Sequence, residues 1–300
     1  MRNVIAVDIG GSKISCGIVD EAGRILYKDF TPLHEIRIDR ILKIIEKAYS
    51  NFPKVETESV GVNIPGLADP KNGVWVFAPY SGITNFPIER ELQPLFRKPI
   101  RVDNDVNACA IAEKRFGCCK DTEDFLWMTV SNGIGGAVYL NNELYRGKHL
   151  LSGEIGHFVM EENGPPCGCG NRGCLEAVAS GPAIARLYCR LSGIPVCETM
   201  RSREVGKLAK RGDANALKSF ETAGNYLGKA ISYAVNLLNI DRVVLGGGVL
   251  MDESLIMPSI KSSFEKNIFR RANTSVLIRK TQLGYDAALL GAAAVALSNR

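Results

Sequence analysis

Four residues that could bind a metal ion lie in one short stretch, "HFVMEENGPPCGCGNRGC". Cys167, Cys169 and Cys174 follow the pattern Cys-x-Cys-x4-Cys, and His157 lies ten residues before the first of them. Three thiolates and one imidazole form a complete tetrahedral ligand set for zinc, with no position left open for a substrate. The glycines and asparagine between them allow tight turns. The stretch therefore predicts a structural zinc site, and a redox pair of cysteines is the alternative.

Two glutamates flank this stretch. Glu154 precedes His157 by one helical turn, and Glu176 follows Cys174 by two residues. Carboxylates can accept paired hydrogen bonds from neighbouring hydroxyl groups. The zinc loop is therefore expected to hold in place a surface that binds a polyol. The alternative for each glutamate is a solvated surface charge.

Three glycine turns could bind a nucleotide. The first, "DIGGSK", combines a carboxylate, two glycines, a hydroxyl and a lysine, namely Asp8, Gly10, Gly11, Ser12 and Lys13. Its N–H groups could surround a phosphate, and Asp8 could hold a metal ion through water. The second, "SNGIGGA", contains Gly133 and Gly135. The third, "LGGGV", suits adenine and ribose on a bare backbone, with the glycines Gly246, Gly247 and Gly248.

Each turn alone could be only a hairpin that requires positive φ angles. None of them has the spacing of a P-loop or of a G-x-G-x-x-G dinucleotide site. Because two of the turns occur in similar surroundings, the phosphate-binding interpretation gains weight.

The segment "RVDNDVNA" places Asp103, Asn104 and Asp105 where a predicted strand meets a predicted helix. One of the three is expected to be the helix cap. Of the others, a carboxylate could take the proton of a substrate hydroxyl while Asn104 holds a neighbouring hydroxyl. Strand ends that face a cleft are where such groups gather.

Apolar periodicity and turn residues predict the elements that position these groups. Strands are expected at residues 3–8, 14–19, 24–30, 59–64, 74–79, 100–103, 124–130, 137–140, 144–147 and 241–248. Helices are expected at residues 39–52, 104–117, 182–191, 202–211, 213–238 and 287–298.

The pattern of strand, glycine hairpin, strand, tight turn and strand occurs twice, roughly 125 residues apart, which indicates a duplicated α/β architecture. The expected domains are a smaller one, residues 1–106 with a C-terminal helix at 286–300, and a larger one, residues 107–285, which carries the zinc loop.

Composition limits the class of protein. The chain has 300 residues, 46% hydrophobic and 23% charged, with a net charge of +5 from 37 basic and 32 acidic residues. This mild excess has no block of like charge and gives no reason to expect nucleic acid. No signal peptide or membrane span is expected, so we predict a cytoplasmic protein. The nine cysteines are then not expected to form disulfides.

Several motifs together resemble the ROK family of bacterial repressors and sugar kinases. They are "DIGGSK", "VDNDVNA", "SNGIGGAVYLNNELYRG", "GEIGH", "CGCGNRGCLE", "LGGGV" and "GYDAALLGAAAVA". The resemblance covers nearly the whole chain. It implies the actin/hexokinase-like (ribonuclease H-like) duplicated two-domain fold, which agrees with the internal repeat.

The resemblance also implies an activity, the transfer of the γ-phosphoryl group of Mg-ATP to a hydroxyl, commonly the 6-OH, of a hexose or N-acetylhexosamine. Asp105 would be the catalytic base. The sugar would be bound by Gly66, Asn104, Glu154, His157 and Glu176. The phosphates would be lined by Gly10, Gly11, Ser12, Lys13, Gly133 and Gly135, and the adenosine by Gly246–Gly248. His157 would use one ring nitrogen for zinc and the other for the sugar. Members of the family commonly form homodimers, so the resemblance also implies a homodimer.

Some positions depart from the family pattern. Asn132 and Ala137 stand where a threonine and a glycine are frequent, and "APYSGITNFP" differs from the usual segment near the sugar. A repressor would carry a DNA-binding segment before the first glycine turn, yet the first predicted strand begins near the N-terminus, so a repressor is not expected. The remaining alternative is a sugar sensor without catalysis.

Overall fold

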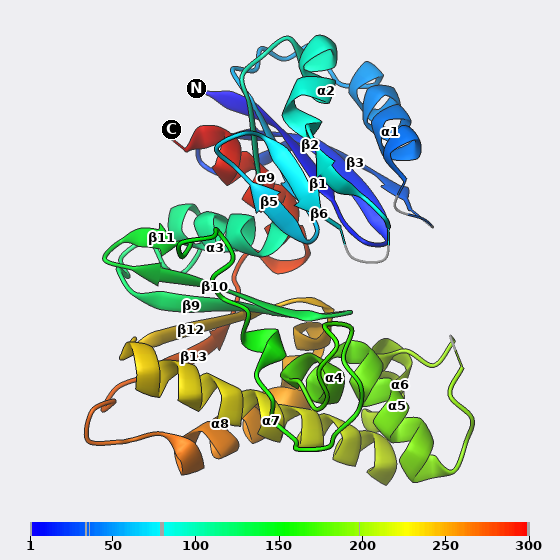
Figure 1. Ribbon diagram of the computed structural model, residues 1–300, viewed down its shortest axis with the longest axis vertical. Helices are drawn as coiled ribbons and strands as arrows, with labels where there is room; N and C mark the ends of the chain where they lie inside the picture. The colour runs from blue at the N-terminus through cyan, green and yellow to red at the C-terminus, as the bar shows by residue number, and fades with distance from the viewer. Residues whose placement is uncertain (1, 34, 36, 79–80, 198, 299–300) are drawn as a thin grey trace. The chain divides into compact units, whose positions relative to one another are not determined.

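The structure is a computed structural model that describes residues 2–33, 35, 37–78, 81–197 and 199–298. The chain divides into two compact units (Figure 1). Unit 1 contains residues 1–122, 146–151 and 282–300, and unit 2 contains residues 123–145 and 152–281.

A five-stranded sheet with the order β3-β2-β1-β4-β8 forms the centre of unit 1. Strands β1 (Asn3–Ile9), β2 (Lys13–Asp20) and β3 (Ile25–Pro32) pair in antiparallel fashion. Strands β4 (Val60–Ile64) and β8 (Ile100–Asn104) continue the sheet parallel to β1. A small second sheet consists of β5 (Leu67–Asp69), β6 (Val74–Phe77) and β7 (Thr84–Phe86).

Helices cover both faces of the main sheet of unit 1, which is why β1 is apolar without alternation. Ile5 and Val7 belong to the core cluster that includes residues of α1 and α2, whereas Val4 and Ala6 pack with α9. Figure 1 shows α9 against this sheet although it ends the chain. The helices are α1 (Ile38–Ser50), α2 (Ile88–Phe96), α3 (Asp105–Arg115), the short η3 (Gly284–Asp286) and α9 (Ala287–Leu297).

Unit 2 repeats the strand order of unit 1, as β11-β10-β9-β12-β13. Its first three strands, β9 (Phe125–Val130), β10 (Ile134–Leu140) and β11 (Glu143–Tyr145), are antiparallel neighbours. Strands β12 (Arg242–Gly246) and β13 (Leu277–Lys280) follow in parallel. The duplicated α/β fold predicted from the sequence is therefore confirmed.

The core of unit 2 lies between this sheet and its helices. Leu126, Met128 and Val130 alternate along β9 and join the same apolar cluster as Leu227 and Ile256. Figure 1 shows the long α7 beside α8 in this layer. The helices are η1 (Ile155–His157), α4 (Leu175–Ala179), α5 (Gly181–Ser192), α6 (Ser202–Ala209), α7 (Ala214–Leu238), η2 (Gly248–Asp252) and α8 (Glu253–Asn267).

The division into units differs from the predicted domain boundaries. The prediction ended the first domain at residue 106, whereas α3 belongs to unit 1. The reason is close packing: a Cβ atom added to Gly291 of α9 would lie 2.9 Å from the backbone carbonyl carbon of Ala108 in α3. The segment 146–151 also belongs to unit 1, which the sequence pattern did not indicate.

Within the described part of the chain, no helix is both long and apolar enough to cross a membrane. The segment "APYSGITNFP" (78–87), which departs from the family pattern, includes residues 79 and 80, and these lie outside the described residues.

Candidate active site and metal centre

The predicted carboxylates of unit 1 lie where parallel strands end. β1, β4 and β8 are in register, so that Asp8, Asn63 and Asp103 are neighbours across the sheet. All three side chains are buried. The carboxyl ends of parallel strands meet at one edge, and this edge is where ligands bind in open α/β sheets.

Asn104 and Asp105 follow at the junction of β8 and α3. Asn104 is the N-cap of α3, because its Oδ1 accepts hydrogen bonds from the N–H groups of Val106 (2.9 Å) and Asn107 (3.2 Å). Its Nδ2 donates to the Gly66 carbonyl (2.6 Å) and to Asp105 Oδ1 (3.1 Å). The predicted residues Gly66, Asn104 and Asp105 therefore form one hydrogen-bonded group, in which the Asn104 amide is engaged by the protein.

The environment of Asp105 suits a general base. Burial raises the pKa of its carboxyl to about 6, although hydrogen bonds from the backbone and from Asn104 oppose this rise. A base with such a pKa is ionised near neutral pH and can still accept a proton. Burial, together with the charge of Asp105, raises the pKa of Asp8 to about 7, and Lys13 opposes that rise.

This edge of the sheet fits a divalent cation. Asp8 and Asp105 lie near enough for the charge of Asp105 to disfavour ionisation of Asp8. Asn63 is fully buried and donates to the Ala288 carbonyl (2.7 Å), while its Oδ1 accepts no hydrogen bond from the described residues. Proteins bind Mg²⁺ through one or two carboxylates, with water and phosphate oxygens as the other ligands. The carboxylates of Asp8 and Asp105 and the unpaired Oδ1 of Asn63 are oxygen donors that could bind such a cation.

Asp103 has a structural partner. Both of its oxygens accept hydrogen bonds from Arg146, at 2.9 Å from Nη1 and 2.5 Å from Nη2. Such a bidentate pair fixes the orientation of the carboxylate and occupies both of its oxygens. This pair anchors the segment 146–151 to unit 1, and the sequence alone did not indicate it. Of the two aspartates in "DNDVNA", Asp105 is therefore the candidate base.

The first glycine turn joins β1 to β2. The Gly10 N–H donates to the Lys13 carbonyl (2.9 Å), which closes the hairpin, and Gly11 and Ser12 form its tip. Lys13 Nζ lies 4.7 Å from the ring centroid of Tyr285 and 6.0 Å from that of Phe30. The face of an aromatic ring attracts a cation, so these contacts help to position the Lys13 side chain. Sequence reasoning did not single out these two aromatic residues.

The two glycine turns of unit 2 lie next to each other. Gly246 of β12 pairs with Thr129 of β9, so both turns follow the same end of the sheet. Gly247 has a φ of 92°, and a Cβ atom there would lie 2.4 Å from the Val130 carbonyl oxygen. Only glycine therefore fits this position without strain. Gly133 lies in the turn itself, while Gly135 lies inside β10.

Glu176 of α4 contacts the second glycine turn. Its Oε2 accepts a hydrogen bond from the Ile134 N–H at 3.0 Å. A Cβ atom added to Gly133 would lie 2.5 Å from the same oxygen. The sequence placed Glu176 beside the zinc loop, and its contact with the glycine turn was not predicted.

The predicted metal ligands come together. The ligand atoms of His157, Cys167, Cys169 and Cys174 all lie within 4.8 Å of one another. Cys167 Sγ lies 3.7 Å from His157 Nδ1, and Cys169 Sγ lies 3.7 Å from Cys174 Sγ. A tetrahedral zinc ion with Zn–S bonds of about 2.3 Å requires sulfur atoms about 3.8 Å apart. The cluster therefore fits zinc.

His157 presents its two nitrogens in different directions. Nδ1 faces the cysteine sulfurs, and Nε2 lies 3.6 Å from Glu154 Oε2. The pKa of Glu154 is raised, chiefly by burial; His157 opposes this rise and the charge of Glu176 adds to it. His157, Glu154 and Glu176 thus lie near one another at the metal cluster, as the sequence predicted.

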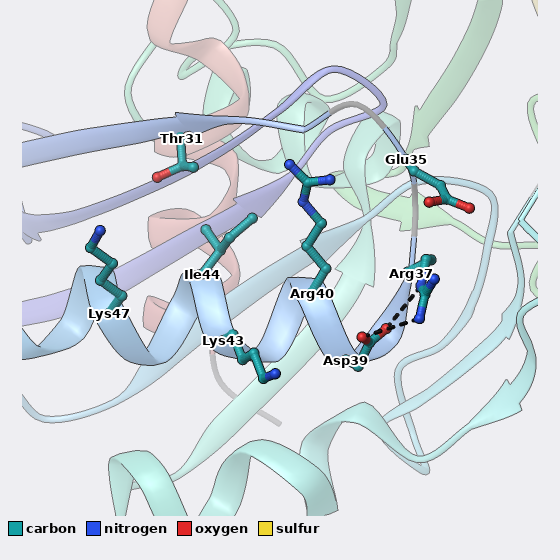
Figure 2. A pocket seen from close by; sticks show the side chains of 8 residues that line it. All are labelled: Thr31, Glu35, Arg37, Asp39, Arg40, Lys43, Ile44 and Lys47. Carbon is teal, nitrogen blue, oxygen red and sulfur yellow. Dashed lines mark hydrogen bonds and ion pairs between the residues drawn. The ribbon is translucent and has the colours of Figure 1, made fainter.

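A separate groove of about 530 Å³ lies in unit 1. Figure 2 shows Arg40 and Ile44 of α1 pointing toward the strand that carries Thr31, with Arg37 and Asp39 paired at 3.1 Å. None of the predicted site residues lines it. The groove is therefore distinct from the carboxylates and glycine turns described above.

Comparison with known proteins supports one family. The chain is 32% identical to a glucokinase of Thermotoga maritima over 307 residues, which cover 97% of this chain and 96% of that protein. It is 29% identical to the xylose repressor of Bacillus subtilis over 302 residues, which cover 98% of this chain and 77% of the repressor.

The solved structure of a ROK family glucokinase from Streptomyces griseus, in complex with glucose and AMPPNP, is also similar. It aligns with a TM-score of 0.87 and 30% identity, and the alignment covers 98% of this chain and 99% of that one. The sequence profile of the ROK family matches residues 4–299. The chain therefore belongs to the ROK family.

Proposed function

We propose that this protein is an ATP-dependent sugar kinase that acts on a hydroxyl, the 6-OH, of a hexose or N-acetylhexosamine. The observation that carries the proposal is the partly buried Asp105 carboxylate at the start of α3, with its pKa raised to about 6. A sensor has no need of a base at this position, whereas a kinase does. The glucokinases among the relatives make glucose the first sugar to test.

In the proposed reaction, Asp105 accepts the proton of the sugar hydroxyl. The hydroxyl oxygen forms a bond to the γ-phosphorus of ATP, the bond from that phosphorus to the bridging oxygen breaks, and ADP leaves. Transition states of this kind are loose, so the protein mainly positions groups and balances charge. Lys13 and the N–H groups of Gly11 and Ser12, at the tip of the hairpin that the Gly10 N–H closes, would contact phosphate oxygens. Asp8 would hold Mg²⁺, which supplies charge neutralisation.

Unit 2 would supply sugar and nucleotide contacts. Glu154, His157 Nε2 and Glu176 would accept or donate hydrogen bonds to sugar hydroxyls. The N–H groups near Gly133 and Gly135 would face phosphate, and Gly246–Gly248 would leave room for adenosine. Zinc held by His157 and the three cysteines would have a structural role, because four protein ligands leave no coordination position for substrate.

The test is ADP release by the purified, zinc-loaded protein with Mg-ATP and a panel of hexoses, hexosamines and N-acetyl sugars. Sugar-dependent release that Asp105→Asn abolishes is the expected result. If no sugar stimulates release above the rate of ATP hydrolysis alone, the kinase proposal fails.

A sugar sensor without catalysis is the second candidate, and the similarity to a xylose repressor favours it. Calorimetry with the same sugar panel separates the two candidates. A sensor would bind a sugar with no phosphoryl transfer to it, whereas a kinase would show both.

A further inference from the structure

Glu176 is held between the zinc loop and the second glycine turn of unit 2. It lies in the short helix α4, which begins directly after the metal ligand Cys174. Its backbone position is set by the neighbouring Leu175, whose N–H donates to the Phe158 carbonyl at 2.8 Å. The carboxylate extends from there to the turn between β9 and β10.

One oxygen of Glu176 supports that turn. Oε2 accepts the Ile134 N–H at 3.0 Å, a charge-assisted hydrogen bond. Elsewhere the turn is held by the backbone, since the Gly181 N–H donates to the Ser131 carbonyl at 2.8 Å. Removal of the carboxylate would leave the Ile134 side of the turn without this acceptor.

The other oxygen is free to bind a ligand. Among the described residues, Glu176 Oε1 has no hydrogen-bond donor, and the side chain is only partly buried. The lack of a side chain at Gly133 matters here, because a Cβ atom there would lie 2.5 Å from Oε2 and displace the carboxylate. The turn and the glutamate therefore fit each other.

We propose that Glu176 is a positioning residue that couples sugar binding to nucleotide binding within unit 2. Oε1 binds a sugar hydroxyl, and Oε2 holds the turn whose N–H groups face phosphate. A sugar that fixes the carboxylate also fixes the turn, so each ligand strengthens binding of the other by the same factor. This inference rests on the proposed function and assigns Glu176 a role beyond sugar contact.

The experiment measures AMPPNP binding by calorimetry, with and without glucose, in the zinc-loaded protein. In Glu176→Ala, sugar-free AMPPNP binding should weaken by about threefold to tenfold, as expected for loss of one hydrogen bond. The enhancement by glucose should also disappear. Glu154→Ala is the matched control: it removes a neighbouring carboxylate with no bond to the turn, so it should weaken glucose binding and leave sugar-free AMPPNP binding unchanged.

The conservative variant Glu176→Gln keeps an oxygen acceptor for Ile134. It should retain sugar-free AMPPNP affinity within about twofold, which a general loss of structure would not allow. The reciprocal variant Gly133→Ala changes the turn alone, and it should weaken glucose binding in the absence of nucleotide, because Oε2 must move.

Two different failures are distinguishable. If wild-type protein transfers no phosphoryl group to any sugar, the proposed function fails. If wild-type protein is a kinase but Glu176→Ala binds AMPPNP as tightly as wild type, the coupling is rejected. Should Glu176→Ala lose zinc or fold poorly, unchanged glucose affinity in Gly133→Ala rejects the coupling independently.

Discussion

Asp103, Asn104 and Asp105 are adjacent in the chain, yet each side chain has a different partner. Asp103 pairs with Arg146, Asn104 caps α3, and Asp105 stays beside Asp8 with its pKa raised. The differences follow from where β8 ends and α3 begins, because each successive side chain then points to a different neighbour. This arrangement makes Asp105 the residue on which the proposed chemistry depends.

Replacement of Asp105 by asparagine should lower kcat by roughly 10²–10⁴-fold, the usual contribution of a general base. The shape of the side chain is kept, so the dissociation constant for sugar should change little. Steady-state kinetics and calorimetry measure the two quantities. Asp103→Asn is the comparison, and it should reduce stability more than it alters the chemical step. Turnover of Asp105→Asn within tenfold of wild type would contradict the assigned role.

The raised pKa of Asp105 predicts the pH dependence of the reaction. A base must be ionised, so log(kcat/KM) for the sugar should fall as the pH decreases through about 6. The fall should approach one unit of log(kcat/KM) per pH unit. A profile measured from pH 5 to 8 that stays flat down to pH 5 would show that the group does not control the rate.

At the residue scale, the sequence identified the kinds of side chain at the candidate site but not the residues with which they interact. The clustering of His157 with the three cysteines could be predicted because thiolates and an imidazole at short spacing have few uses other than metal binding. The Arg146–Asp103 pair, the Lys13–Tyr285 contact and the Glu176–Ile134 hydrogen bond each join residues that are far apart in the chain. Local spacing carries no information about such contacts.

At the scale of elements, the loop that carries the Cys/His cluster has little packing of its own and would depend on a bound metal for its stability. Most of its residues are exposed, including Cys169, and two isolated bridges provide its regular pairing: Val159 with Cys174 and Pro166 with Arg172. Gly173 has a φ of 69° and packs against the Glu161 carbonyl, so the loop also contains a tight turn at this glycine. Loops with little buried surface open most easily, and here the metal would supply the missing stability.

Replacement of Cys169 by serine should therefore release zinc and loosen the loop that carries His157 and leads to Glu176. Sugar affinity should fall by at least about tenfold, the lower end of the effect of removing groups that support a metal site. Metal analysis and calorimetry test both effects. Cys197→Ser, at another exposed cysteine outside the cluster, is the control and should change neither. Equal sugar affinity before and after metal removal would refute a supporting role for zinc.

Among the described residues, the sequence predicted most elements but missed the helices α2, α4 and α8 and the short strands β5, β7 and β13. The two longer missed helices are α2 and α8. Both contain an internal proline, Pro94 and Pro258, and proline usually ends or bends a helix. Packing compensates in each case: Leu92 and Phe96 are buried in unit 1, and Ile256 and Ile260 in unit 2. Burial of these apolar side chains outweighed the helix-breaking effect of each proline. The packing partners that provide this burial cannot be identified from the local sequence.

At the scale of the whole molecule, the buried carboxylate of Asp8 and the partly buried carboxylate of Asp105 should make stability depend on pH. Their folded-state pKa values of about 7 and about 6 lie above the ordinary value of 3.8, so the folded state binds more protons than the unfolded state between these limits. The free energy of unfolding should therefore decrease as the pH rises from about 4 to 7.

Urea denaturation at pH 5, 6 and 7.5 measures this effect. The Asp8→Asn variant, which removes one of the two groups, should show a smaller decrease than wild type. Mg²⁺ with ADP should also reduce the decrease in wild type, because a bound cation favours the ionised carboxylates. Identical slopes for wild type and Asp8→Asn would show that Asp8 is not the source.

The position of α9 bears on how the protein is made. Unit 1 begins with β1, but Val4 and Ala6 are covered by α9, which follows all of unit 2 in the chain. A ribosome must therefore translate unit 2 before the first strand gains its partner on that face. Unit 2, apart from residues 146–151, is one uninterrupted stretch from residue 123 to 281 and can close while synthesis continues. Unit 1 would then begin synthesis before unit 2 but complete its sheet packing after it, and a chain truncated before α9 would leave this face of the sheet exposed to chaperones and proteases.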